Sequence, residues 1–342
     1  MEFQVIWFIL WGLLWAVYFM LDGFDFGAGI LLSLLAHNEN EKKTIIHTIG
    51  PVWNGNEVWL ITAGGATFAA FPTTYALMFS YLYTPLLLIL FSLIFRGVAL
   101  EFRELGSGEN WKKNWDRTII VSSFIPSLLF GVAFGNIFQG LPMDAYGYHG
   151  TLITLLNPYG LLTGALFVLL FIEHGALWLS MKTSGELSER SARLANRVWF
   201  ALLGIAVLFL IYTAFATHLY ANYLENVLWI AFPAIAVLAL LGIRLFSSSG
   251  KYLRAFYSSS LTIVMIVFTG VIGLYPNLIP SSMDQAYSLT IFNSSSSIYT
   301  LKIMTVVALI FVPVVIAYQI WLYRIFRHKV TAEDIAHDRE AY

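Results

Sequence analysis

Nine long apolar runs, separated by short polar segments, constrain the fold of this chain more than any other feature of its sequence. A helix needs about 20 apolar residues to cross the hydrocarbon core of a bilayer, and each run reaches that length. The sequence therefore predicts an all-α polytopic membrane protein with nine transmembrane helices. The runs lie at about 5–35, 51–71, 74–98, 118–140, 158–181, 196–217, 226–246, 255–275 and 299–324.

The composition excludes an ordinary soluble domain. Of the 342 residues, 58% are hydrophobic and 11% are charged, whereas a soluble protein carries about 25% charged residues. The net charge of −1 gives no reason to expect a nucleic-acid partner. The chain contains no cysteine, which excludes disulfides, thiolate metal sites and iron–sulfur ligation.

The positions of the basic residues predict the orientation of the chain. Of the 19 Lys and Arg residues, all except Lys302 lie at the ends of the first, third, fifth, seventh and ninth runs or in the polar segments that follow them. Cytoplasmic segments of membrane proteins are enriched in Lys and Arg. We therefore expect the N-terminus outside the membrane and the C-terminus in the cytoplasm.

A faint internal repeat suggests how the nine helices are grouped. Residues 25–28 (DFGA) of the first run resemble residues 173–176 (EHGA) of the fifth, and the fourth and eighth runs share a Ser-Ser pair followed by Gly-Val. Such matches also arise by chance among Gly- and Ser-rich membrane helices. The repeat predicts one integral membrane domain, 1–342, with four-helix bundles at 1–140 and 158–276, a ninth helix at 299–325 and a cytoplasmic tail at 326–342.

Polar side chains inside the first two runs are the main candidate functional residues, because ionisable groups at membrane depth are costly. Asp22 and Asp25 share one helix face. Asn54, Asn56 and Glu57 lie near the start of the second run. In the predicted orientation both groups fall in the cytoplasmic half of the membrane. The sequence leaves open whether they form a hydrogen-bonded knot that fixes packing or a path for protons.

The charge state of these acids depends on their partners. No Lys or Arg lies within the first two runs, so no cation from these helices can pair with the carboxylates. We therefore expect the acids to be protonated, hydrogen-bonded to one another or in contact with internal water.

Glu173 and His174 in the fifth run form a second, weaker pair of candidates. A buried histidine can ligate haem iron or relay protons, but most single buried histidines only hydrogen-bond a neighbour. No two histidines on facing helices stand out as a pair of axial ligands. We therefore expect this chain to hold no metal and to ligate no haem iron.

Two further features concern helix faces. Trp7, Trp11 and Trp15 repeat every four residues along the first run, and the sequence does not decide whether this stripe faces lipid, a quinone tail or another helix. The small residues of segment 62–70 predict close helix packing.

Residues 21–29 (LDGFDFGAG) followed by 50–60 (GPVWNGNEVWL) resemble subunit II of the cytochrome bd quinol oxidases. Further matching segments are 63–66, 68–72, 134–136, 139–140 and 156–161. The resemblance extends over essentially the full chain, including the nine helices and their orientation. It implies a subunit of a respiratory enzyme of the bacterial cytoplasmic membrane, which oxidises quinol and reduces dioxygen to water.

The resemblance also implies partners and cofactors. In that family two haems b and one haem d belong to subunit I, and subunit II packs against subunit I as a pseudo-symmetric heterodimer needed for haem assembly. A small single-helix accessory subunit, membrane lipid and quinone are further expected partners. A proton path through the first two helices of subunit II has been proposed for the family, which agrees with the cytoplasmic-side position of the polar cluster.

One position departs from the family pattern. The family often has Asp where this chain has Asn54. An amide orients water but cannot ionise, so a relay here would depend on Asp25 and Glu57.

Two other functions compete with this interpretation. In an ion-coupled secondary transporter the buried acids would be coupling sites, but no pair of runs is broken by Pro and Gly at its centre, as such transporters often show. In a pure scaffold the acids would only hold helices together. A partner that contains haem would distinguish an oxidase subunit from a transporter.

Overall fold

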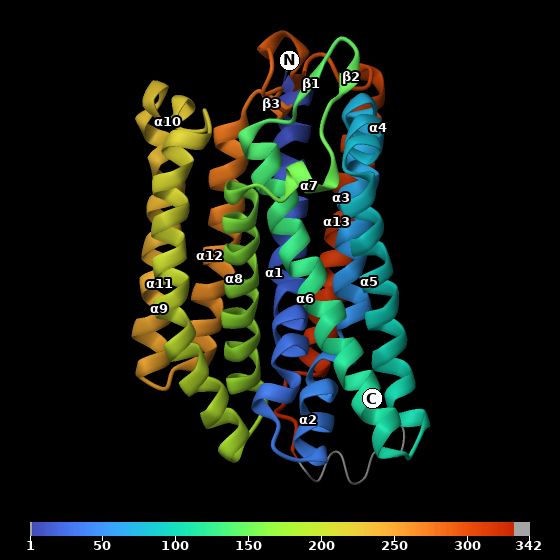
Figure 1. Ribbon diagram of the computed structural model, residues 1–342, viewed down its shortest axis with the longest axis vertical. Helices are drawn as coiled ribbons and strands as arrows, with labels where there is room; N and C mark the ends of the chain where they lie inside the picture. The colour runs from blue at the N-terminus through green and yellow to red at the C-terminus, as the bar shows by residue number, and fades with distance from the viewer. Residues whose placement is uncertain (1, 332–342) are drawn as a thin grey trace.

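Long helices run side by side along a single axis and make up most of the chain (Figure 1). The computed structural model describes residues 2–331. Eight helical segments in this part of the chain are long and apolar enough to cross a membrane. They are α1 (Glu2–Leu35), α5 with the 3₁₀ turn η1 (Tyr83–Phe102 and Arg103–Leu105), α6 (Glu109–Gln139), α8 (Pro158–Lys182), α9 (Gly185–Ala216), the 3₁₀ turn η2 with α11 (Val227–Ile230 and Ala231–Ser248), α12 (Tyr252–Leu274) and α13 (Ile298–Ile325).

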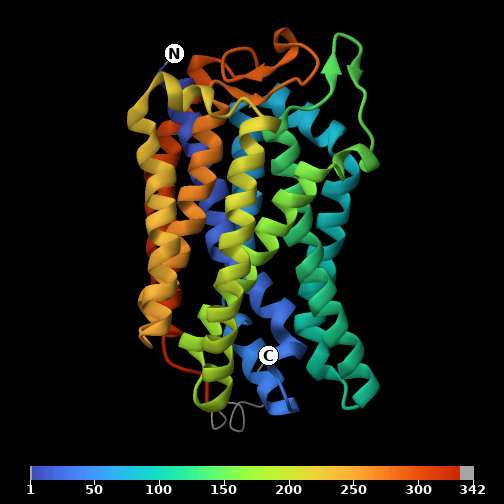
Figure 2. The ribbon, with the colours of Figure 1, turned by 60° about the vertical axis from the view of Figure 1, so that its left-hand side comes forward.

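The remaining elements are shorter. The helices are α2 (Glu39–Ile49), α3 (Trp53–Ala70), α4 (Pro72–Tyr81), α7 (Leu152–Leu155), α10 (Ala221–Glu225) and the 3₁₀ turn η3 (Gln285–Tyr287). Two small antiparallel pairs, β1 (Met143–Asp144) with β2 (Gly147–Tyr148) and β3 (Asn277–Ile279) with β4 (Leu289–Thr290), lie together at one end of the helices (Figure 2).

The all-α membrane fold predicted from the sequence is confirmed. The expected second span, 51–71, is helix α3, which is not among the eight segments that meet the length and hydropathy criteria. Its first turns carry polar side chains, which lower its hydropathy. The count of nine spans therefore stays a prediction, and most of the predicted tail 326–342 lies outside the described residues.

The two helices α1 and α8 lie at the centre and touch at two glycines (Figure 1). A Cβ atom added to Gly27 would lie 1.8 Å from the Phe171 carbonyl oxygen, and one added to Gly175 would lie 2.4 Å from the Ala28 nitrogen. Helices that approach this closely exclude any side chain at the crossing. The residues next to the crossing are therefore fixed in position by backbone contact.

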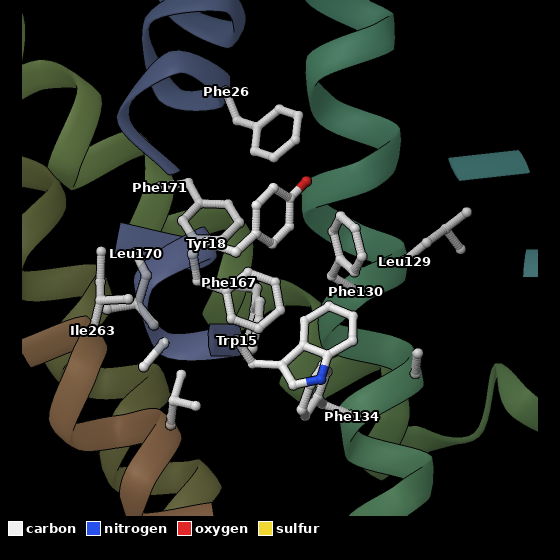
Figure 3. Close-up of a cluster of buried hydrophobic side chains, with 14 of the residues drawn as sticks. Trp15, Tyr18, Phe26, Leu129, Phe130, Phe134, Phe167, Leu170, Phe171 and Ile263 are labelled. Carbon is white, nitrogen blue, oxygen red and sulfur yellow. The ribbon is translucent and has the colours of Figure 1, made fainter. Parts of the chain in front are cut away.

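Aromatic side chains fill the space beside this crossing. Phe19 lies edge-on to Phe130, Phe134 and Phe167, with ring centroids 5.1 to 5.4 Å apart. Figure 3 shows Phe130, Phe134 and Phe167 of this cluster, with Trp15 and Tyr18 of α1 among them. Edge-to-face contacts of this kind add to the stabilisation from burial.

The tryptophan stripe of α1 faces other helices of this chain. Trp7, Trp11 and Trp15 are all buried. The Trp7 indole N–H donates to the Leu301 carbonyl oxygen of α13 at 3.2 Å, and the Trp11 indole N–H donates to Thr67 Oγ1 of α3 at 3.1 Å. Of the environments that the sequence left open, a neighbouring helix is the one observed.

Helices α6 and α8 form the interior, whereas α9, α11 and α13 form the outside. In the most apolar stretch of each helix, 67% of the residues of α6 and of α8 are buried, against 17% in α9, 22% in α11 and 6% in α13. The outer helices present their apolar side chains to the surroundings, which is the arrangement of a protein solvated by lipid.

Candidate functional site

Arg96 of α5 lies at the centre of a buried polar cluster between α1, α3 and α5. Its Nη2 donates to Asp22 Oδ1 at 2.5 Å and lies 3.4 Å from Glu57 Oε1. The guanidinium also stacks over the Phe26 ring, 4.3 Å from the centroid. A charge this deeply buried persists only when it is paired, because desolvation is otherwise too costly. The cluster is therefore held together by an ion pair.

This ion pair corrects one expectation from the sequence. The first two runs lack a cation, but α5 supplies one, so the prediction that the acids have no cationic partner is wrong. Arg96 was grouped with the basic residues at a cytoplasmic helix end, whereas α5 continues to Phe102 and Arg96 lies well inside it. A lone arginine within an apolar run was the signal that would have identified it.

Asp25 is held by an amide from α3. Asn56 Nδ2 donates to Asp25 Oδ2 at 2.7 Å and to the Leu21 carbonyl oxygen at 3.2 Å. The Asn56 Oδ1 in turn accepts hydrogen bonds from the Tyr323 hydroxyl at 2.8 Å and from Gln319 Nε2 at 3.3 Å. Both donors come from α13, and neither was singled out in the sequence. The network ties α1, α3 and α13 together around a carboxylate.

Asn54 and Glu57 lie nearer the surface than the rest of the cluster. The Glu57 side chain is 20% exposed, whereas Asp22 and Asp25 are fully buried. Asn54 is exposed and does not join the cluster. It lines an opening of 380 Å³ at the start of α3, whose other walls include Glu101 of α5 and Tyr318 of α13.

The structure therefore brings together four of the five main candidates, Asp22, Asp25, Asn56 and Glu57, around Arg96. The fifth, Asn54, lies at the mouth of the nearest opening. Carboxylates, amides and a guanidinium within hydrogen-bonding distance of one another can bind water and exchange protons.

The weaker candidates lie apart from this cluster, on α8. His174 contacts Ser259 Oγ at 2.9 Å through Nδ1 and the Met20 carbonyl oxygen at 3.0 Å through Nε2. The carbonyl can only accept, so Nε2 carries the proton and Nδ1 accepts from Ser259. Both ring nitrogens are occupied, and His174 therefore does not fit as a ligand of haem iron.

Glu173 is fully buried, and neither of its carboxylate oxygens has a hydrogen-bond partner. The side chain that interacts electrostatically with this carboxylate is Arg244 of α11. Arg244 is hydrogen-bonded elsewhere, because its Nη1 donates to Asn196 Oδ1 of α9. Within residues 2–331, no group of three or more His, Asp or Glu side chains could hold a metal ion.

Ion pairs at the helix ends opposite the N-terminus connect distant parts of the chain. Asp116 of α6 accepts from Lys42 at 2.7 Å and from Arg103 at 2.6 Å. Glu41 of α2 accepts from Arg190 of α9 at 2.6 Å. Burial raises the pKa of Glu41, but hydrogen bonds from the backbone N–H of His37 and from Arg190 outweigh it and lower this pKa below its ordinary value.

The small-residue segment 62–70 of α3 packs on one side only. Ala63, Thr67 and Ala70 are buried, as close packing requires. A Cβ atom added to Gly64 or Gly65, however, would meet nothing within 4 Å. For these two glycines the prediction of close packing is wrong within this chain. They line an apolar groove of 530 Å³ between α3 and helices α4 and α5, which we call the α3 groove.

Comparison with known proteins identifies the family. The model of the family described as cytochrome bd terminal oxidase subunit II matches residues 3–326. The chain belongs to this family. It is 40% identical to cytochrome bd-I ubiquinol oxidase subunit 2 of Escherichia coli K12, over 97% of this chain and 96% of that one.

Two further matches agree. Cytochrome bd ubiquinol oxidase subunit 2 of Bacillus subtilis 168 is 36% identical over 96% of this chain and 97% of its own length. The structure of bd oxidase from Geobacillus thermodenitrificans superposes with a TM-score of 0.80 at 19% identity, covering 95% of this chain and 99% of that one. At that identity the superposition shows the fold alone.

Membership of the cytochrome bd subunit II family makes this chain a subunit of a quinol oxidase and a multi-pass protein of the bacterial cytoplasmic membrane. The family also implies haem within the complex and a subunit I partner. The resemblance found in the sequence is thereby confirmed, and the transporter interpretation is set aside.

Proposed function

We propose that this chain, as subunit II of a cytochrome bd quinol:oxygen oxidoreductase, stabilises the haem-bearing subunit I and carries protons towards it from the cytoplasm. The observation that carries the proposal is the cluster of Asp22, Asp25 and Glu57 around Arg96, with Glu57 partly exposed. Acids at membrane depth are costly, so several of them grouped together, one of them partly exposed, indicate a task beyond packing.

The proposed topology has nine spans, with the N-terminus outside and the C-terminus in the cytoplasm. Helix α3 is the ninth span, because its 18 residues rise by about 27 Å, close to the thickness of the hydrocarbon core. The basic residues cluster at the helix ends opposite the N-terminus, as the positive-inside rule requires.

The proposed architecture is a pair of four-helix bundles, α1–α6 and α8–α12, related by a rough two-fold axis along the membrane normal. Such an axis would make α1 equivalent to α8 and α6 equivalent to α12. In support, α1 packs on α12 as α8 packs on α6. The equivalent glycines Gly27 and Gly175 touch each other, as residues beside the axis must.

Subunit I, with two haems b and one haem d, is proposed to dock on the face that contains the α3 groove. Gly64 and Gly65 leave this part of α3 open to the backbone of another helix, and Ile61 and Phe68 beside them are 73% and 61% exposed. Small residues flanked by large apolar ones are typical of helix interfaces in membranes. Lipid, quinone and a single-helix accessory subunit are further proposed partners.

Protons would enter at the opening beside Asn54 and reach the acids through Glu57. Asn54 cannot ionise, so it would orient a water molecule without carrying the proton. Glu57, Asp22 and Asp25 would then exchange protons around Arg96, whose fixed positive charge favours the presence of a carboxylate at this depth. Quinol is the substrate of the complex, and this chain would hold neither the haems nor the reacting oxygen.

Replacing Asp25 with Asn tests this path. Asparagine keeps the size of the side chain and can still hydrogen-bond to Asn56, but it does not titrate. In the purified complex we expect normal haem content, with quinol-dependent oxygen consumption and proton uptake about tenfold slower or more, the usual range for loss of a proton-transfer group.

Asp284→Asn is the matched control, because Asp284 caps the turn η3 in an exposed loop far from the cluster. We expect this variant to keep full activity. A scaffold that moves no protons is the competing function, and the tie between Asp25, Asn56 and Tyr323 favours it. Full activity and proton uptake in the Asp25→Asn complex would establish the scaffold and refute the path.

A further inference from the structure

Four buried polar side chains form a stripe along α1. Trp15, Tyr18, Asp22 and Asp25 follow at intervals of three or four residues, the spacing of one helix face. Each is at most 6% exposed. Each also carries a polar atom without a hydrogen bond of ordinary geometry, namely Trp15 Nε1, the Tyr18 hydroxyl, Asp22 Oδ2 and Asp25 Oδ1. The stripe spans about 15 Å of helix, or about half of the hydrocarbon core.

The helices that face this stripe add unpaired groups of their own. Arg96 of α5 contributes Nε and Nη1, Glu57 of α3 contributes Oε1, and Ser123 of α6 contributes its hydroxyl. In folded proteins nearly all buried polar groups are hydrogen-bonded, either to protein or to ordered water. So many unpaired groups along one line are typical of a chain of internal water molecules.

We propose that Tyr18 receives protons from the Asp22 region and passes them along α1 to the level of Trp15 and the α3 groove. This inference rests on the proposed proton path and specifies the direction that the path takes after Asp22. It assigns a relay role to a residue outside the acid cluster, near the midpoint of α1.

The position of Tyr18 suits this role. It is fully buried and lies beside Asp22. Its ring is fixed by edge-on contacts with Phe130 at 5.4 Å and with Trp15 at 6.3 Å. In Figure 3 the hydroxyl points away from α1, between Phe26 and Phe130. The aromatic neighbours hold the ring, and the polar side chain that interacts with the hydroxyl is Asp22.

The chemistry of the step needs only water on either side of the hydroxyl. The Tyr18 oxygen accepts a proton from a water molecule next to Asp22 and releases its own proton to the next water, so the ring carries no net charge afterwards. Trp15 has a donor and no acceptor, so it can hold the last water but cannot relay. Trp15 and Phe130 line the α3 groove, which lies on the face proposed for subunit I.

Tyr18→Phe in the purified complex tests the proposal, because it removes only the hydroxyl. That hydroxyl makes no hydrogen bond of ordinary geometry, and the side chain it interacts with is Asp22. We therefore expect unchanged haem content and at most a small change in the midpoint of thermal inactivation. Oxygen consumption per haem and proton uptake should both fall about tenfold, and the solvent deuterium isotope effect on turnover should change.

Tyr159→Phe is the matched control. Tyr159 of α8 is equally buried, but its hydroxyl hydrogen-bonds to Thr213 Oγ1 at 2.8 Å, away from the stripe. We expect this variant to lose some thermal stability and to keep its turnover per haem.

The outcomes separate this inference from the path on which it rests. If turnover per haem falls in Asp25→Asn but is unchanged in Tyr18→Phe, the proton path stands and Tyr18 is not part of it. Full turnover in both would refute the path as well. Haem loss in Tyr18→Phe with normal turnover per remaining haem would show a structural hydroxyl and overturn the proposal.

Discussion

The two halves of the chain place a buried acid at matching positions and surround it differently. Asp25 lies two residues before Gly27 and accepts a hydrogen bond from Asn56. Glu173 lies two residues before Gly175, and neither of its oxygens has a partner. In the proposed two-fold arrangement the same helical position carries a carboxylate in both halves, but only in the N-terminal half is it part of a network.

The neighbouring helices show where the difference arises. Residues 56–59 of α3 read NEVW, and residues 196–199 of α9 read NRVW. In the first half the asparagine binds the acid, whereas in the second half Asn196 accepts from Arg244. Arg197 stands where the first half has Glu57. The same alignment puts Leu170 where the first half has Asp22. The second half therefore lacks both Asp22 and Glu57, the two carboxylates that contact Arg96.

The largest expected difference between the halves concerns their arginines. In Arg96→Met, the buried Asp22 and the partly exposed Glu57 lose their cation. Removing one partner of a buried ion pair costs about 3–5 kcal/mol. We expect little assembled complex and little haem. Arg244→Met removes a partly exposed arginine with no ion pair among the described residues, so the cost should be at most about 1 kcal/mol.

The yield of haem-containing complex and the midpoint of thermal inactivation measure this difference. Equal losses in the two variants would mean that the halves depend on their arginines alike, and the comparison would fail.

A second, smaller effect concerns Glu173. A charged carboxylate without a partner is costly to bury, so an uncharged side chain of the same shape should be tolerated. We expect Glu173→Gln to keep its oxygen consumption and proton uptake within about twofold, as is usual for a residue that transfers no proton. Its thermal midpoint should be no lower than that of the unmodified complex. Proton uptake slowed as strongly as in Asp25→Asn would give the second half a path of its own.

The smallest effect concerns the ion pair between Glu41 and Arg190, which joins the halves at the helix ends opposite the N-terminus. Glu41 has a lowered pKa in the folded chain, so its contact with Arg190 stabilises the fold above the unfolded pKa of about 4.3. This stabilisation is lost as the pH falls through the lower, folded value. Glu41→Gln should therefore cost less than about 1 kcal/mol near neutral pH and nothing in strong acid. The check is to compare the thermal midpoints of Glu41→Gln and of the unmodified protein from strong acid to neutral pH.

The sequence predicted the helices well because lipid imposes a simple requirement of length and apolarity. Eight of the nine expected spans meet it, and α3 falls short because its first turns hold Asn54, Asn56 and Glu57. The same polar residues revealed the site. Spacing within one helix was thus enough to place Asp22 with Asp25. The same spacing puts Asn54 on one face with Glu57, but Asn54 is exposed and does not join the cluster.

Contacts between helices distant in sequence could not be derived in this way. Arg96, Gln319 and Tyr323 reach the cluster from α5 and α13, and their approach depends on packing that no local pattern encodes. The sequence also did not predict that Gly64 and Gly65 have no close neighbour within this chain. A small residue predicts a close helix neighbour, but it does not indicate whether that helix belongs to the same chain or to another.

The contact between Gly27 and Gly175 also bears on the ancestry of the chain. Were the two halves separate molecules, this would be a residue meeting its own copy across a two-fold axis, which is the signature of an isologous dimer. A side chain added at either glycine collides with the backbone of the other half. Neither glycine can therefore be replaced by a larger residue unless the two helices move apart. Once two such halves are joined in one polypeptide, the acids and arginines of each half can be substituted independently. The contact between Gly27 and Gly175 would still keep the same residue type on both sides.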